Sequence, residues 1–287
     1  MRKNFLAFLL PVSIFLILAG CKKSSNGNNT PGGTNGTGQH VSSTKEYAWK
    51  SGQWKPIGAS AFTYNNDCQK VLETDANLDT TTGQSKGDTS KHLLTYNTNG
   101  TLHDHTIQFV DKGTGNWVNS FRVSYGYLNN TDSPSTEVTA SWKNNQWQSV
   151  DSTVNTYDNS GHKISAVEWF NNTSSSSWTK GPQTTISYTG SGRISQILIL
   201  YSIEVSGITI GEDQRETSSY DTNGNLSTVL FEASTSTPDN WIKAGQESCT
   251  YTADGLLAEV IFQSANPISG VWMNNAKIDY SYTNSCQ

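Results

Sequence analysis

The sequence predicts an all-β protein, an antiparallel meander of about sixteen short strands. Three observations support this. Eight tyrosines recur at intervals of 30 to 32 residues, a tryptophan stands ten residues before six of them, and no stretch after the first twenty residues has a helical period. Repetition in fixed phase is typical of an array of similar structural units. The repeat tyrosines are Tyr64, Tyr96, Tyr127, Tyr157, Tyr188, Tyr220, Tyr251 and Tyr282, and the tryptophans are Trp54, Trp117, Trp147, Trp178, Trp241 and Trp272.

Each unit is predicted to hold a strand from Trp to Tyr, a turn, a return strand and a polar loop. Turns such as YDTNG follow the tyrosines, and return strands such as GNLSTVLFEA follow the turns. Because ten is even, the Trp and Tyr of a unit are expected on one face of the sheet, and the small residue before each Tyr on the other. Eight such strands, seven return strands and the segment KEYAW before Trp54 give sixteen.

The sheet is predicted to close into a barrel resembling a porin. An open sheet would leave the aromatic columns in water and two edges unpaired. Cysteines replace the glycine of the repeat turns only in the first and last units, at Cys68 and Cys286. A disulfide between them is predicted, and it requires the two ends of the array to be adjacent. The alternative is an open, extended or shell-like repeat sheet.

The N-terminus has the features of an export signal. Residues 1–20 combine a basic start with an apolar stretch that ends in Leu18-Ala19-Gly20 before Cys21. This motif resembles the signal of bacterial lipoproteins, which implies a diacylglycerol on the sulfur of Cys21 and a further acyl chain such as palmitate. Residues 21–43 are predicted to be the lipidated cysteine and a flexible tether, and residues 44–287 a single β-repeat domain.

The repeats carry a second resemblance. Phased Trp and Tyr with YDTNG-type turns resemble the YD-type hairpin repeats of secreted bacterial proteins, although that family has a period nearer twenty residues. Together with the lipoprotein motif they resemble Bacteroidetes lipoproteins of unknown function described as having a porin-like barrel. The resemblance implies a fold and an outer-membrane lipid anchor, with periplasmic or surface orientation open. Because its motifs are structural, it implies no catalytic residue.

Composition and motifs exclude several classes of function. The formal charge is −5 with no basic stripe, so no nucleic acid is expected as a partner. His103 and His105, with His92, could bind a metal, but a polar strand patch is the simpler interpretation. Glu212, Asp213 and Glu216 form an acidic cluster in which nothing fixes a catalytic pair. No enzyme activity, metal or cofactor is therefore predicted.

The predicted function is a non-enzymatic structural, adhesin-like or assembly-partner role in the cell envelope. The alternative is a protein that binds a glycan or another small ligand, because aromatic side chains outside the repeat phase are natural platforms for sugar rings. The candidate residues are Trp142, Trp169 and Phe170. A carbohydrate-active enzyme and an outer-membrane channel are less favoured. The expected partners are the membrane, through the lipid anchor, and a glycan or another envelope protein.

Overall fold

The computed structural model describes residues 39–128, 131–172, 177–201, 203–205, 208–210, 213–234, 240–266 and 269–283. In this part of the chain there is no helix that is long and apolar enough to cross a membrane. The strands are β1 (His40–Lys50), β2 (Gln53–Tyr64), β3 (Lys70–Leu78), β4 (Ser85–Tyr96), β5 (Leu102–Val110), β6 (Trp117–Tyr127), β7 (Pro134–Lys143), β8 (Gln146–Tyr157), β9 (Lys163–Asn172), β10 (Ser177–Tyr188), β11 (Ile194–Leu200), β12 (Ile203–Val205), β13 (Ile208–Ile210), β14 (Asp213–Tyr220), β15 (Leu226–Ser234), β16 (Trp241–Tyr251), β17 (Leu257–Ala265) and β18 (Trp272–Thr283).

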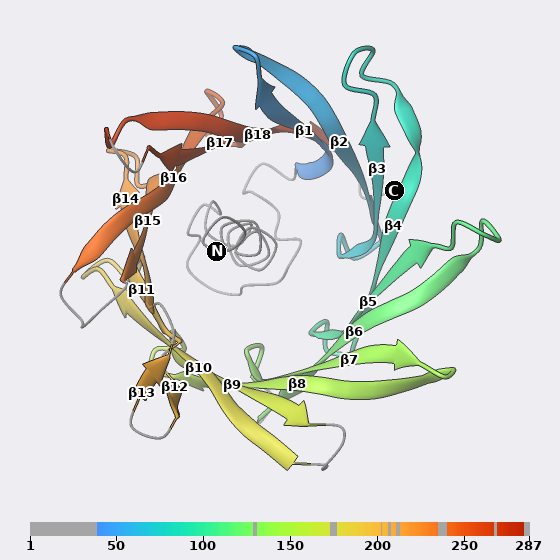
Figure 1. The fold of residues 1–287 in the computed structure, drawn as a ribbon. Coiled ribbons are helices and arrows are strands. Elements are labelled where there is room, and N and C mark those ends of the chain that lie inside the picture. The colour runs from blue at the N-terminus through green and yellow to red at the C-terminus, as the bar shows by residue number, and fades with distance from the viewer. Residues whose placement is uncertain are drawn as a thin grey trace.

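Sixteen of these strands close into one antiparallel barrel (Figure 1). Consecutive strands pair throughout, and β1 completes the ring by pairing with β18, where Thr44 lies opposite Tyr280. The predicted strand number and closure are confirmed, and the open-sheet alternative is wrong. The remaining strands, β12 and β13, form a separate hairpin between β11 and β14, which are neighbours in the barrel.

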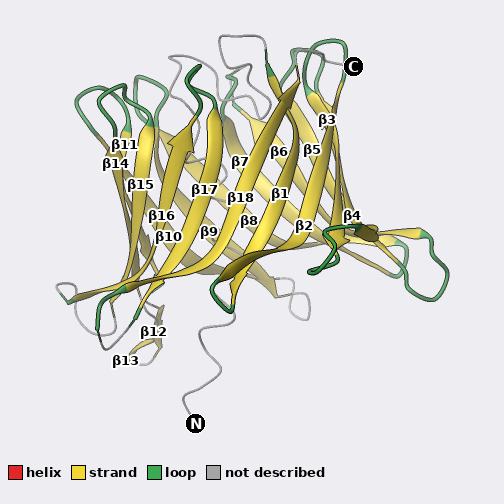
Figure 2. Cartoon of the chain, turned by 90° about the horizontal axis from the view of Figure 1, so that it is seen from above, coloured by secondary structure: helices red, strands yellow, loops and turns green. Residues whose placement is uncertain are grey.

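The two rims of the barrel differ (Figure 2). Short turns follow the repeat tyrosines at one rim, and their glycines have positive φ, for example +82° at Gly224 and +85° at Gly100. Cys68 adopts the same conformation, with φ +60°, and it is not a free thiol. Cys286 lies outside the described residues, so its pairing with Cys68 stays a prediction. The β12–β13 hairpin lies at the opposite rim.

The prediction that the Trp and Tyr of one unit share a face is wrong, because a β-bulge separates them. In β8 the register shifts by one residue at Val150, so Trp147 points to the opposite face from Tyr157. Arg122, which lies over the Trp147 ring at 4.9 Å, is on that opposite face. Six strands carry the extra residue at the same place, seven residues before the tyrosine: Ile57, Thr89, Ser120, Val150, Ala244 and Asn275.

We assign the tyrosine face to the inside of the barrel. Side chains on the concave face of a closed sheet converge and shield one another, whereas those on the convex face diverge. Most buried strand residues lie on the tyrosine face, among them Leu94, Val229 and Val260. The residues just before the tyrosines lie on the outer face, and seven of the eight are exposed serines or threonines.

Every repeat tyrosine forms a hydrogen bond between its strand and the neighbouring one. Its hydroxyl donates a hydrogen bond of 2.7–2.9 Å to a backbone carbonyl near the start of the preceding strand, as Tyr251 does to Leu226. Each such bond contributes about 1 kcal/mol. The other acceptors are Val41, Lys70, Leu102, Pro134, Lys163, Ile194 and Leu257.

Candidate functional site

The inner wall of the barrel carries a group of acidic side chains. Strand register places eight carboxyl groups on this face: Glu46, Glu73, Asp75, Glu137, Asp151, Glu168, Glu216 and Glu247. Lys70 lies 2.8 Å from Glu73, and Lys163 lies 3.8 Å from Glu137. Two sectors of this wall have buried titratable groups and are the candidates for a functional site.

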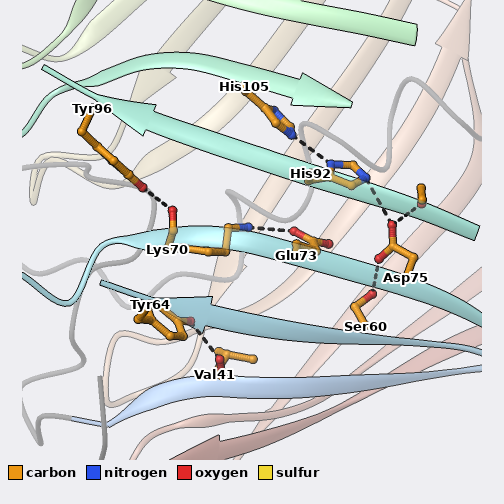
Figure 3. A network of polar contacts seen from close by, with 10 residues as sticks. Val41, Ser60, Tyr64, Lys70, Glu73, Asp75, His92, Tyr96 and His105 are labelled. Carbon is orange, nitrogen blue, oxygen red and sulfur yellow. Dashed lines mark hydrogen bonds and ion pairs between the residues drawn. The ribbon is translucent and has the colours of Figure 1, made fainter. Parts of the chain in front are cut away.

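The first sector is a polar network across β2, β3, β4 and β5 (Figure 3). The Asp75 carboxylate accepts hydrogen bonds from the hydroxyls of Ser60, at 2.7 Å, and Ser90, at 2.6 Å. It also lies 3.2 Å from Nε2 of His92, whose Nδ1 lies 2.9 Å from Nε2 of His105. Asp75 is therefore held by three donors from two neighbouring strands.

The network favours the ionised form of Asp75 and the neutral form of His105. Burial opposes ionisation of Asp75, but hydrogen bonds from His92, Ser90 and Ser60 outweigh it and lower the pKa of the carboxyl. Burial, with repulsion from His92 and Lys70, lowers the pKa of His105 to about 4. Both ring nitrogens of His92 are engaged, one by Asp75 and one by His105, so this imidazole presents no nitrogen to a substrate.

The two histidines of the segment His103-Asp104-His105 have different surroundings. His103 lies at a bulge and is 2.9 Å from Asp104, whereas His105 contacts His92. Of the three histidines considered as metal ligands from the sequence, the structure brings His92 and His105 together. Among the described residues, no group of three or more His, Cys, Asp or Glu side chains is arranged to hold a metal ion.

The second sector contains Glu216 of β14 and Glu247 of β16. Phe231 of β15 lies between them, because it is opposite Glu216 on one side and opposite Gly245, two residues before Glu247, on the other. Glu247 is 0% exposed and Glu216 9% exposed. Neither carboxyl oxygen of Glu247 has a hydrogen-bond partner.

Burial governs the ionisation of both carboxyl groups. It raises the pKa of Glu216 to about 7. Burial, reinforced by the charge of Glu216, raises the pKa of Glu247 to about 8.

The acidic cluster expected from sequence is rearranged. Register puts Asp213 on the outer face and Glu216 on the inner one, and Glu212 lies outside the described residues. The backbone amide of Tyr201 donates to the Asp213 carboxylate at 3.1 Å. Sequence reasoning missed Glu247 as the neighbour of Glu216. The sequence does carry a signal for this pair, because both residues stand four positions before a repeat tyrosine.

The three aromatic residues predicted to bind a ligand do not all share one face. Trp142 packs edge-on against Trp147, at 4.9 Å between ring centroids, on the outer face. Trp169 also lies on the outer face, opposite Ser152, whereas Phe170 lies on the inner face and is 42% exposed. Their ligand-binding role stays a prediction.

Two grooves at equivalent repeat positions, of about 630 and 550 Å³, lie at the rim with the short turns. In the first, Asn65, Asp67 and Gln69 of one turn face residues 97–100 of the next. In the second, the same repeat positions hold Asp221, Asn223 and Asn225, facing residues 252–255. Both grooves are lined by amides, carboxylates and hydroxyls beside a repeat tyrosine.

The outer wall carries cations stacked on the repeat tryptophans. Lys91 lies 4.2 Å from the Trp117 ring centroid, and Arg215 lies 4.5 Å from that of Trp241. Each cation stands five residues before a repeat tyrosine and covers the Trp of the following unit. Sequence reasoning missed these pairs because it placed the tryptophans inside.

Comparison with known proteins finds distant likenesses to several solved structures. No protein-family model matches the chain, and no curated protein matches it. A porin-like protein from Bacteroides uniformis is 11% identical, with 85% of this chain and 98% of that chain covered and a TM-score of 0.49. A porin-like protein from Bacteroides vulgatus is 9% identical over the same shares, with a TM-score of 0.48. A protein of unknown function from Bacteroides fragilis is 10% identical, with 45% and 91% covered and a TM-score of 0.39.

Proposed function

We propose that the chain is a lipid-anchored, non-enzymatic barrel of the cell envelope that stands in water and serves as a scaffold or assembly partner. The observation that carries this proposal is the polar outer wall. Lys277 lies 2.9 Å from Glu259 and 3.0 Å from Asp279 in mid-strand, and Arg215 lies 2.7 Å from Glu232. The anchor would be Cys21, which lies outside the described residues.

A lipid-facing barrel needs the opposite outer surface. Such barrels present a continuous apolar band, and a Lys or Arg at the middle of the bilayer costs about 2–4 kcal/mol. The outer face of this barrel combines those ion pairs with a column of exposed hydroxyl residues at the strand ends. An aqueous setting satisfies these groups, which supports a tethered barrel over a membrane channel.

The inner wall supports a non-enzymatic role. The Asp75 network is fully hydrogen-bonded, and His92 presents no nitrogen to a substrate. A general base needs an accessible atom within hydrogen-bond reach of the proton it removes. The geometry of this network therefore favours a structural role, in which it links four strands, over a catalytic one.

The test is to purify the protein as a Cys21→Ser variant, which cannot carry the lipid, and to mix it with liposomes. We expect it to stay soluble without detergent, to remain in the supernatant when the liposomes are pelleted, and to leave them impermeable to ions. The wild-type protein isolated from envelopes is the matched control and should pellet with liposomes. Detergent-dependent solubility and ion conductance of the variant would overturn the proposal.

Glycan binding is the second candidate, and the paired rim grooves favour it. Amide and carboxylate side chains beside a tyrosine are suited to sugar hydroxyls, and both grooves repeat the same positions. A glycan array should identify a ligand that is lost when Thr98→Trp and Ala253→Trp fill the two grooves. Binding that persists in this double variant would place the ligand elsewhere.

A further inference from the structure

We propose that the inner wall contains a binding site for an organic ammonium ion, built by Glu216, Phe231 and Glu247. This inference concerns the inner face and does not depend on the scaffold role proposed from the outer face.

The register defines the geometry of the site. Glu216 lies directly opposite Phe231, and Glu247 lies one diagonal step away on the other side of the same ring. Directly opposed residues are about 4.5–5.5 Å apart at Cβ, and diagonal neighbours about 7–8 Å, within reach of long side chains. Gly245, opposite Phe231, adds no side chain between the ring and Glu247. The two glutamate residues therefore stand on either side of Phe231 along the inner wall.

Glu247 provides an independent indication of a missing partner. Its side chain is completely buried, and neither of its carboxyl oxygens has a hydrogen-bond partner. An ionised carboxylate in this position is strongly unfavourable unless a cation or donors compensate it. Asp75, another acid of the inner wall, has donors from Ser60, Ser90 and His92. The sheet thus supplies donors to one inner-wall acid and none to Glu247.

The chemistry of the surroundings selects the ligand class. A carboxylate beside an aromatic face is the arrangement that recognises ammonium groups, through charge and through the ring quadrupole. The two side chains directly opposite Glu247, those of Val229 and Phe262, are apolar and suit an alkyl stem. No set of three metal ligands is present among the described residues, which favours an organic cation. Where Glu247 carries a proton, binding of the alkylammonium displaces that proton to water.

The test is isothermal titration of the purified protein with n-hexylamine at pH 8.5, with n-hexanol as the uncharged control of the same length. We expect the amine to bind and the alcohol to give no heat of binding. Glu247→Gln and Glu216→Gln should each weaken amine binding at least tenfold. Glu259→Gln, which removes an outer-face carboxylate, should leave it unchanged.

A further variant separates the site from a general loss of fold. Phe231→Leu keeps both carboxyl groups and an apolar side chain, and it should weaken amine binding several-fold through loss of the cation–π contact. Thermal unfolding of each variant checks that the barrel is intact. No binding of hexylamine to the wild type, equal binding to the folded Glu247→Gln variant, or equal binding of hexanol would overturn the proposal.

Discussion

The carboxyl group of Glu247 predicts an unusual dependence of stability on pH. Burial raises its pKa from 4.5 to about 8 in the folded protein. An acid that binds its proton more tightly when folded stabilises the fold below pH 4.5, and this contribution is lost as pH rises towards 8. The rise corresponds to at most about 5 kcal/mol, at about 1.4 kcal/mol per pH unit. Glu247→Gln removes this group, so its free energy of unfolding should fall less steeply with pH than that of the wild type.

The assay is urea unfolding of the wild type, Glu247→Gln and Glu259→Gln at pH 5, 6, 7 and 8. The Glu247→Gln variant should be the more stable protein at pH 8 and should lose its advantage towards pH 5. The slopes of wild type and variant should differ by up to about 1.4 kcal/mol per pH unit. The outer-face variant should keep the wild-type slope. Parallel slopes for wild type and Glu247→Gln would show that this carboxyl group ionises normally and would refute the reasoning.

Three further predictions concern the repeat contacts, each checked by urea unfolding. Tyr251→Phe should lower the free energy of unfolding by about 1 kcal/mol through loss of the hydroxyl donor, and an unchanged value would show that this bond adds nothing. Gly224→Ala and Gly52→Ala should each cost about 1 kcal/mol, because both glycines have positive φ and the Arg193 guanidinium over Gly224 is the end of a flexible side chain that can move aside; no loss of stability in either variant would contradict this. Arg122→Gln should cost about 0.5–1 kcal/mol and expose Trp147 to acrylamide quenching, whereas unchanged quenching would exclude the stacking contact.

The sequence period predicts much of the fold, but the position of the bulges is not readable from it. Glycine at the turns marks the strand ends, because positive φ restricts the residue type. The extra residue in the strands is restricted by no such rule, and its six occupants share no chemistry: Ile57, Thr89, Ser120, Val150, Ala244 and Asn275. An even spacing of ten therefore predicts one face for Trp and Tyr, and one inserted residue reverses it.

The distance in sequence from a repeat tyrosine predicts where along its strand a site residue lies. Which side chains that residue contacts depends on the sequences of the neighbouring strands. His92, Glu216 and Glu247 all stand four residues before a repeat tyrosine. His92 meets Asp75 and becomes part of a network with several donors, whereas Glu247 meets Val229 and Phe262 and has none. These partners come from return strands, which lack the phased Trp and Tyr of the repeat. The chemistry of each sector was therefore beyond prediction from the repeat alone.

On the outer wall, side-chain contacts as well as strand pairing join the two ends of the sheet. Three cations cover the tryptophan of the following unit, whereas Lys277 lies in β18, which closes the barrel by pairing with β1. Its ammonium instead lies 6.0 Å from the Trp54 ring and 4.7 Å from the Tyr47 ring, both in the first two strands. The last unit thus contacts the first unit in the same way as each of those cations contacts the unit that follows it. Ser152 holds the cation position before Trp178, and that indole is 43% exposed. The covering of a tryptophan therefore depends on the residue in the preceding unit, and for Trp54 that residue is supplied only when the sheet closes.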